Sequence, residues 1–275
     1  MKYEEIDIWN GFEYKSAAEG FRPVLAAYIL DNKPSRGAIL ICPGGGYAGT
    51  SEREGEPIAF RFAAAGYHTF VLYYSVAPDK HPMPLRDVTR AMCIIRDNAK
   101  KWGINENKIA VMGFSAGAHL AGSLATLWNE EYLSDVPGMK PGKNRPNAAV
   151  LCYPVITGGE FREEGSFKNL TCGDEKLAEE MSLEKRVSAD TPPTFLWHTV
   201  SDEIVPVENS LLFANALRKN NVPFEMHIYP EGPHGLATSD AETCQEDLCD
   251  AHVATWMDLC AQWLESVWGK AEYYK

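Results

Sequence analysis

Short apolar runs alternate along the chain with longer segments in which apolar residues recur every three or four positions. The runs are rich in aliphatic and aromatic residues and lie at 38–42, 70–74, 109–113, 148–153, 194–199 and 224–229. Runs of this length predict buried strands, and their alternation with helical segments is typical of a mostly parallel sheet covered by helices on both faces. An earlier run, at 24–30, is predicted to add an antiparallel edge strand.

The helical segments have the apolar spacing of amphipathic helices. Helices are predicted over 55–65, 84–101, 115–128, 207–220 and 250–268. The last segment carries one apolar stripe, made of Val253, Trp256, Met257, Cys260, Trp263, Leu264 and Val267. Such a stripe indicates a helix that packs on a protein core, in preference to a membrane or a partner.

Two stretches interrupt the alternation. The stretch 129–147 is rich in Pro, Gly and Lys, and the stretch 157–192 has one charged helical pattern near 175–186. Both are interpreted as loop or cap excursions over the strand ends that shape a pocket. Because 275 residues suit one large α/β unit, a single domain over 1–275 is predicted.

Composition and charge narrow the classes of partner. The formal net charge of −12 repels phosphate backbones and anionic lipid, so neither nucleic acid nor a membrane is expected as a partner. The first residues, MKYEEIDIWNG, lack the basic start and apolar segment of a secretory signal, which favours a soluble cytoplasmic protein. The seven cysteines are an odd number and several lie in apolar runs, so a disulfide framework is not expected. The oligomeric state is left open.

Ser115 lies between a predicted strand and a predicted helix, inside the sequence Gly-Phe-Ser-Ala-Gly at 113–117. This spacing matches the G-x-S-x-G nucleophile elbow, in which a sharp turn exposes the serine oxygen and the flanking glycines relieve crowding. The backbone N–H of Ala116 is then a candidate donor to the oxyanion. A small-residue turn that only lets the helix pack on the sheet is the alternative.

A glycine-rich loop, CPGGGYAG at 42–49, follows the strand predicted at 38–42. In this position the α/β-hydrolase HGGG-type loop supplies further oxyanion donors, here the N–H groups of Gly45 and Gly46. Tyr47, beside the loop, is a candidate substrate-binding residue that shortens the acyl pocket; ordinary packing is the equal alternative.

The same loop also satisfies G-x-G-x-x-G through Gly44, Gly46 and Gly49. A dinucleotide site needs a helix that opens at this loop and an acidic residue at the end of the next strand. That strand ends in Leu-Tyr-Tyr-Ser at 72–75, so no cofactor is predicted. Neither H-E-x-x-H nor paired C-x-x-C occurs, so no metal is predicted either.

Two later strands are each followed by a candidate partner for Ser115. Asp202 follows the strand at 194–199, and His234 lies in a Gly/Pro loop after the strand at 224–229. The order Ser, acid, His is that of the nucleophile-elbow hydrolases, which predicts a triad with His234 as base and Asp202 as its orienting acid. His119 stays open as an alternative base, and Glu203 as an alternative acid.

Taken together, these segments resemble the α/β-hydrolase esterase and lipase superfamily, and most closely its bacterial acetyl esterase and acetylxylan-esterase-like proteins. The likeness spans roughly 20–268 and is strongest in CPGGGYAG, PLRDVTRAMCIIRDNA, KIAVMGFSAGAHLAG and SDEIVPVENSLLFANALRKNNVPFEMHIYPEGPHG. One departure is Pro43, which stands where hormone-sensitive-lipase-like relatives have the histidine of HGGG.

The resemblance implies an α/β-hydrolase fold with a mostly parallel sheet of about eight strands. It also implies hydrolysis of a small-molecule ester, of the short-chain and often acetyl kind, on sugars among other alcohols, through an acyl-enzyme on Ser115. Two alternatives remain open. The same triad cleaves amides in peptidases and arylformamidases, and an α/β-hydrolase fold also serves proteins that only bind a ligand.

Overall fold

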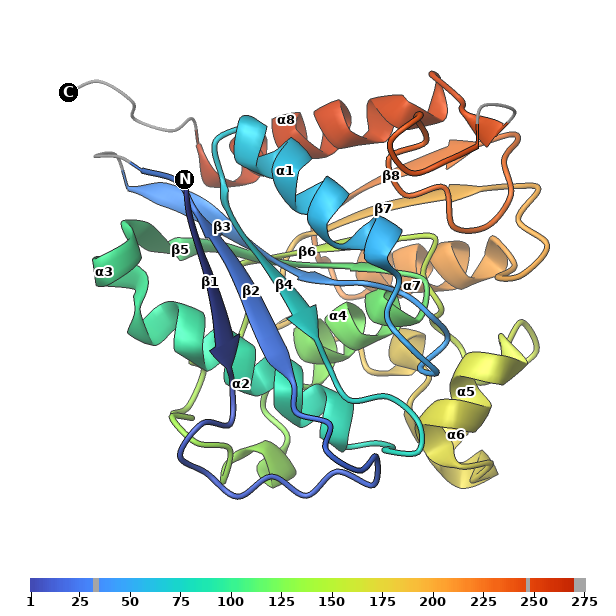
Figure 1. The fold of residues 1–275 in the computed structure, drawn as a ribbon. Helices are drawn as coiled ribbons and strands as arrows, with labels where there is room; N and C mark the ends of the chain where they lie inside the picture. The colour runs from blue at the N-terminus through green and yellow to red at the C-terminus, as the bar shows by residue number, and fades with distance from the viewer. Residues whose placement is uncertain (32–34, 246–247, 270–275) are drawn as a thin grey trace.

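A single sheet of eight strands organises the computed structural model, which describes residues 1–31, 35–245 and 248–269 (Figure 1). The strands lie in the order β1-β2-β4-β3-β5-β6-β7-β8. In chain order they are β1 Lys2–Asp7, β2 Val24–Ile29, β3 Arg36–Cys42, β4 His68–Tyr73, β5 Ile104–Phe114, β6 Ala148–Cys152, β7 Thr194–Thr199 and β8 Phe224–Tyr229.

Six of these strands, β3 to β8, run parallel to one another, and β2 pairs antiparallel with both β4 and β1. The inner parallel strands are buried along most of their length, as expected when helices cover both faces of a sheet. The mostly parallel α/β sheet predicted from the sequence is therefore confirmed, and each predicted apolar run is a strand.

The edge of the sheet differs from the prediction. The run 24–30 forms β2 and is antiparallel as expected, but β1 lies outside it and forms the edge. The sequence of β1, KYEEID, has mostly exposed or half-exposed side chains, because only β2 lies beside it. A polar, charged edge strand lacks the apolar run by which the other strands were found, and its charges discourage pairing with another chain.

The helices form two layers, one on each face of the sheet (Figure 1). The α-helices are α1 Glu56–Ala64, α2 Met83–Asp97, α3 Ala99–Trp102, α4 Ala116–Leu127, α5 Glu164–Thr171, α6 Glu175–Glu180, α7 Glu208–Lys219 and α8 Trp256–Trp268. Short 3-10 turns are η1 Glu52–Glu54, η2 Glu131–Leu133, η3 Leu183–Lys185 and η5 Val253–Thr255. All five predicted helices are present, with the segment 84–101 divided between α2 and α3. No described helix is both long and apolar enough to cross a bilayer.

Each layer of helices encloses its own apolar core. Helices α1 and α8 cover one face, and α2, α4 and α7 cover the other (Figure 1). The apolar stripe of α8 faces the sheet as predicted: Trp256 stacks on Trp197 of β7 with ring centroids 5.2 Å apart and lies 6.0 Å from Phe62 of α1. These aromatic contacts hold the C-terminal helix against the centre of the sheet.

The two excursions start at different ends of the sheet, and an ion pair between Arg186 and Glu130 joins them. The stretch 157–192 folds into α5, α6 and η3, of which α5 was not predicted, and Asn169 of α5 donates a hydrogen bond to the carbonyl of Gly46 at 2.8 Å. The stretch 129–147 instead follows α4, which runs back toward the amino ends of the parallel strands. Its last residue, Asn147, donates to the carbonyl of Ile109 at 2.8 Å, so it cannot border Ser115 at the other end of β5.

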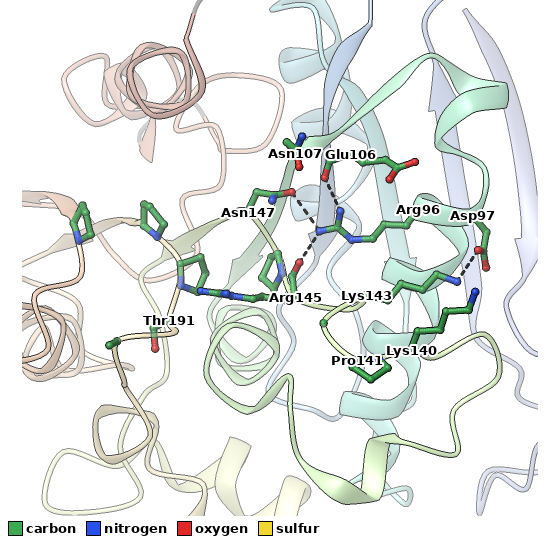
Figure 2. Close-up of a pocket in the computed structure, with 16 residues that line it drawn as sticks. Arg96, Asp97, Glu106, Asn107, Lys140, Pro141, Lys143, Arg145, Asn147 and Thr191 are labelled. Carbon is green, nitrogen blue, oxygen red and sulfur yellow. Dashed lines mark hydrogen bonds and ion pairs between the residues drawn. The ribbon is translucent and has the colours of Figure 1, made fainter.

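A hollow of about 790 Å³ lies at this amino end of the sheet (Figure 2). Its walls come from the segments that lead into β5, β6, β7 and β8, among them Asn107, Asn147 and Pro193. The charged groups in it are largely paired, since Lys143 binds Asp97 at 2.6 Å and Arg96 donates to backbone carbonyls. Ligands of open α/β sheets bind at the carboxyl ends of the strands, so this hollow is not the candidate active site.

Gly117 marks the tightest packing of helix against sheet. A Cβ built on this residue would lie 2.1 Å from the carbonyl oxygen of Cys42 and 2.3 Å from that of Pro43. Because backbone atoms cannot move aside, Gly117→Ala is expected to lower the free energy of unfolding by about 2 kcal/mol or more. Urea unfolding measures the change. Gly49→Ala is the control, because a Cβ at Gly49 meets no atom within 4 Å, and an equal loss in both variants would contradict this explanation.

Candidate active site

Ser115 occupies the turn between β5 and α4 in a strained conformation. Its backbone has φ 53° and ψ −121°, which non-glycine residues rarely adopt. The turn closes because its neighbours are glycines: a Cβ on Gly113 would lie 2.1 Å from the carbonyl oxygen of Gly117. The chain thus forms the sharp strand-turn-helix geometry that the sequence at 113–117 predicts, with the serine at its tip.

The structure brings the three predicted triad residues together. The Nε2 atom of His234 lies 2.8 Å from Ser115 Oγ, and its Nδ1 atom lies 2.6 Å from Asp202 Oδ2. Asp202 follows β7 and His234 follows β8, and these adjacent parallel strands end at the same edge of the sheet as β5. The arrangement has the connectivity of a nucleophile, a base and an orienting acid.

Asp202 is buried and its two oxygens have four partners. Oδ1 accepts the N–H groups of Ile204 and Val205, each at 2.9 Å, while Oδ2 faces His234 and also His198 Nε2 at 3.3 Å. Burial alone raises the pKa of a carboxyl, yet the hydrogen bonds from His198 and His234 hold the pKa of Asp202 well below its usual range. Asp202 is therefore an anion beside the imidazole, whereas the alternative acid, Glu203, is exposed.

His198 is a supporting residue that the sequence did not single out. It is fully buried at the end of β7, where its Nε2–H donates to the carbonyl of Val205 at 2.9 Å. Its Nδ1 atom lies 2.8 Å from Ser210 Oγ, which fixes the ring. The contact between His198 and Asp202 depends on how the loop after β7 folds back. A histidine within an apolar strand therefore gives no sign of this contact in the sequence.

His119, the alternative base, has other partners. Its Nε2 atom lies 3.0 Å from the carbonyl of Met181, and its Nδ1 atom lies 2.9 Å from the hydroxyl of Tyr47. A carbonyl only accepts, so Nε2 carries the hydrogen and Nδ1 accepts from Tyr47. Burial lowers the pKa of His119 to about 4, so the ring is neutral at neutral pH. His119 therefore joins the glycine loop to the 157–192 excursion, and His234 is the histidine at Ser115 Oγ.

Tyr47 is buried in the core beside the site. Its ring is 1% exposed, lies 6.1 Å from the ring of Tyr74 and directs its hydroxyl to His119. The ring has almost no exposed surface through which it could contact a substrate directly. The structure thus favours the packing interpretation of Tyr47 over the predicted substrate-binding one.

The candidate oxyanion donors come from two segments, the glycine loop and the start of α4. Among the described residues, the N–H groups of Gly45 and Gly46 have no protein acceptor. Ala116 begins α4, where an N–H has no acceptor within the helix. The N–H of Ser115 itself donates to the carbonyl of Cys152 at 3.0 Å and is not free for this purpose. Within the described part of the chain, no three His, Cys, Asp or Glu side chains are gathered as a metal site would require.

Comparison with known proteins shows the family of this chain. Residues 28–217 match the family described as BD-FAE. The chain belongs to the BD-FAE family. Over 96% of both chains it superposes on the crystal structure of an acetyl ester-xyloside bifunctional hydrolase from Caldicellulosiruptor lactoaceticus, with a TM-score of 0.85 and 42% sequence identity. The resemblance to acetyl and acetylxylan esterases that the sequence suggested is thereby confirmed.

Two curated relatives are similar to this BD-FAE chain over most of its length. Endo-1,4-beta-xylanase B of Butyrivibrio fibrisolvens is 42% identical over 250 residues, or 86% of this chain and 38% of the relative. Acetylxylan esterase of Xylanibacter ruminicola is 33% identical over 221 residues, or 76% of this chain and 42% of the relative. The chain therefore spans less than half the length of either protein.

The neutral, buried His119 makes stability depend on pH. Its folded-state pKa of about 4 lies below the ordinary histidine pKa of 6.5, so the unfolded chain binds the extra proton as pH falls from about 6.5 toward about 4. Stability is lost in that direction, by about 2 kcal/mol between about pH 7.5 and about pH 5 for this group. We expect His119→Gln to remove that part of the pH dependence, as measured by urea unfolding at both pH values.

Tyr47→Phe is the matched control for this measurement. It removes the hydroxyl that donates to His119 but keeps the titrating ring, so it should lower stability at both pH values and retain the pH dependence. A His119→Gln variant with the full wild-type pH dependence would contradict the assignment.

Proposed function

We propose that this member of the BD-FAE family is a serine esterase that hydrolyses short-chain, chiefly acetyl, esters, including acetylated sugars. The observation that carries the proposal is the continuous hydrogen-bonded path from Asp202 through His234 to Ser115 Oγ. This path ends beside a glycine loop with unpaired N–H groups, which is the combination that acyl transfer from an ester requires.

In the proposed reaction, Ser115 Oγ attacks the ester carbonyl while its proton moves to His234 Nε2. The imidazolium is stabilised by Asp202, and the negative oxygen of the tetrahedral intermediate by the N–H groups of Ala116 and Gly45 or Gly46. The carbon–oxygen bond of the leaving alcohol then breaks, and the alcohol takes the proton from His234. A water molecule releases the acid from the acyl-enzyme by the same steps, again with His234 as base.

The preference for a short acyl group on a sugar has two supports. The names of the relatives, an acetylxylan esterase and an acetyl ester-xyloside hydrolase, point to acetyl esters of xylan-type sugars. Helix α5 also lies directly against the glycine loop through the Asn169–Gly46 hydrogen bond, which limits the room beside the oxyanion. A narrow acyl site excludes long chains and leaves the alcohol side of the ester free to vary.

Removal of the nucleophile tests the mechanism. Ser115→Ala is expected to lower kcat for an aryl acetate by about a thousandfold or more without unfolding the protein, because Ala lacks the attacking oxygen. Ser123→Ala, on the same helix, is the control, since Ser123 Oγ only donates to the carbonyl of His119 at 2.8 Å. A fluorophosphonate should label wild type and the Ser123 variant but not the Ser115 variant. Undiminished turnover in Ser115→Ala would overturn the proposal.

A series of acyl lengths and alcohols tests the specificity. Each methylene bound in an apolar pocket adds up to about 0.8 kcal/mol, so a long-chain lipase would show kcat/KM rising from acetyl to butyryl to octanoyl esters. We expect the reverse order, together with release of acetate from acetylated xylo-oligosaccharides. An octanoyl preference would contradict the short-acyl proposal, and faster cleavage of matched aryl amides would favour an amidase. Tight ligand binding with no turnover of any ester would favour a binding protein.

A further inference from the structure

Glu54 is a buried carboxylate beside the site that the proposed mechanism does not use. It is the last residue of η1, the short turn that follows the glycine loop, and its side chain is 3% exposed in the protein interior. Burial of a carboxylate is costly unless every oxygen is hydrogen-bonded. The Glu54 carboxylate lies close to Ser115, so we expect specific hydrogen-bond donors to offset the cost of its burial.

The hydrogen bonds of Glu54 join three segments of the site. Oε2 accepts the N–H of Gly44 at 2.8 Å, and Oε1 accepts the hydroxyl of Tyr153 at 2.6 Å. The oxygen of Tyr153 in turn accepts the N–H of Ala237 at 3.1 Å. Gly44 begins the glycine loop, Tyr153 follows β6, and Ala237 lies three residues after His234. One carboxylate thus fixes the oxyanion segment relative to the loop that holds the base.

These partners also define the charge of Glu54. The N–H of Gly44 only donates, and the Tyr153 oxygen already accepts from Ala237, so the tyrosine hydrogen is directed at the carboxylate. A protonated Glu54 would leave either its own hydrogen or that of Tyr153 without an acceptor. The ionised form alone satisfies every group. Burial outweighs the other effects and raises the pKa of Glu54 above its usual value, although the bonds from Tyr153 and Gly44 and the proximity of His234 act in the opposite direction. The assignment of the ionised form therefore rests on the hydrogen-bond geometry.

The carboxylate lies close to the reacting groups. A Cβ built on Gly44 would be 2.7 Å from Glu54 Oε2 and 3.0 Å from Ser115 Cβ, so Glu54 and Ser115 flank the same glycine. The ring of Tyr153, which binds Glu54, lies edge-on to His234 with centroids 5.0 Å apart. A negative charge at this position favours the cationic form of the imidazole.

The other ionisable groups around His234 come from every neighbouring segment. Asp202 binds its Nδ1 atom, with His198 behind Asp202, and Ser115 faces its Nε2 atom. Arg53 is the opposing cation: it donates to the carbonyl of Thr243 at 2.8 Å, and its Nη2 atom would lie 3.5 Å from a Cβ on Gly235. Arg53 is exposed to water, which screens its charge, whereas Glu54 is buried and screened much less.

We propose that Glu54 is a second acidic positioning residue of this site, which holds Gly44 and the His234 loop in place and stabilises the imidazolium through its charge. The inference rests on the proposed function, in which His234 gains a proton in each half of the reaction. Asp202 orients the ring from the Nδ1 side, and Glu54 acts on the His234 loop through Tyr153, which binds both Glu54 and Ala237.

The isosteric change Glu54→Gln tests the charge directly. It keeps an acceptor for Gly44 and removes the anion, so His234 should lose its proton at lower pH. The midpoint of the acid limb of kcat/KM is expected to move down by about 0.5 to 1 pH unit. The maximal kcat should fall about three- to tenfold with little change in KM, because the imidazolium forms only after substrate has bound.

Two further variants separate charge from structure. Glu54→Asp keeps the charge but shortens the side chain, so it should lower kcat while it retains the wild-type midpoint. Asp87→Asn is the matched control: Asp87 is fully buried and accepts from Trp9, Tyr14 and Ser75, none of them in the site. It should lower the melting temperature without moving the midpoint. A Glu54→Gln midpoint equal to that of wild type, or an equal shift in Asp87→Asn, would overturn the proposal.

An NMR titration of the His234 ring protons in wild type and Glu54→Gln gives a readout that needs no turnover. A shift to lower pH in the variant is expected. If wild type hydrolyses no ester, the proposed function fails while this titration still tests the effect of Glu54 on His234. If wild type is active and the titration curves coincide, the proposal for Glu54 alone fails.

Discussion

The close approach of α4 to the end of β3 is the constraint on which the rest of this site depends. Gly117 lets the backbone of α4 lie directly against the carbonyl groups of Cys42 and Pro43, and Gly113 lets the turn before the helix close. The two strand ends that carry the nucleophile and the glycine loop are thereby held together. With a side chain at either position, Ser115 and the oxyanion segment would be pushed apart.

From that contact the catalytic geometry follows through the topology of the sheet. Because β5, β6, β7 and β8 are parallel neighbours, the residues that follow these strands all lie at the carboxyl end of the sheet. Asp202 and His234 therefore lie close to Ser115. Buried polar groups then set the orientation of the side chains of the proposed triad and of the glycine loop. His198 supports Asp202, His119 supports the glycine loop through Tyr47, and Glu54 connects that loop to the segment after His234.

The errors in the sequence-based prediction have physical explanations. The edge strand β1 was missed because a strand that is exposed on most positions has no apolar run. Helix α5 was missed because its sequence, EGSFKNLT, is short and has little apolar content, and it is stabilised by the Glu163 side chain at its start and by packing against the glycine loop. The pocket-shaping role expected of 129–147 stays a prediction: its last residue, Asn147, lies at the amino end of β6, and Glu130 near its start binds Arg186 of the 157–192 excursion.

The sequence by itself predicted the mostly parallel α/β architecture, its central strands and five of its helices, and it named Ser115, Asp202 and His234 as a candidate triad, because periodicity and motif spacing are local properties of the chain. It predicted His234 and Asp202 and left His119 and Glu203 open as alternatives, because spacing along the chain does not show which side chains meet. The tertiary structure places His234 and Asp202 in line with Ser115 Oγ and buries Tyr47 in the core. It also brought Glu54 to the site, because a buried hydrogen bond joins Glu54 to Tyr153, 99 positions later in the chain, and such a contact leaves no local pattern. His198 contacts Asp202 because the loop after β7 folds back.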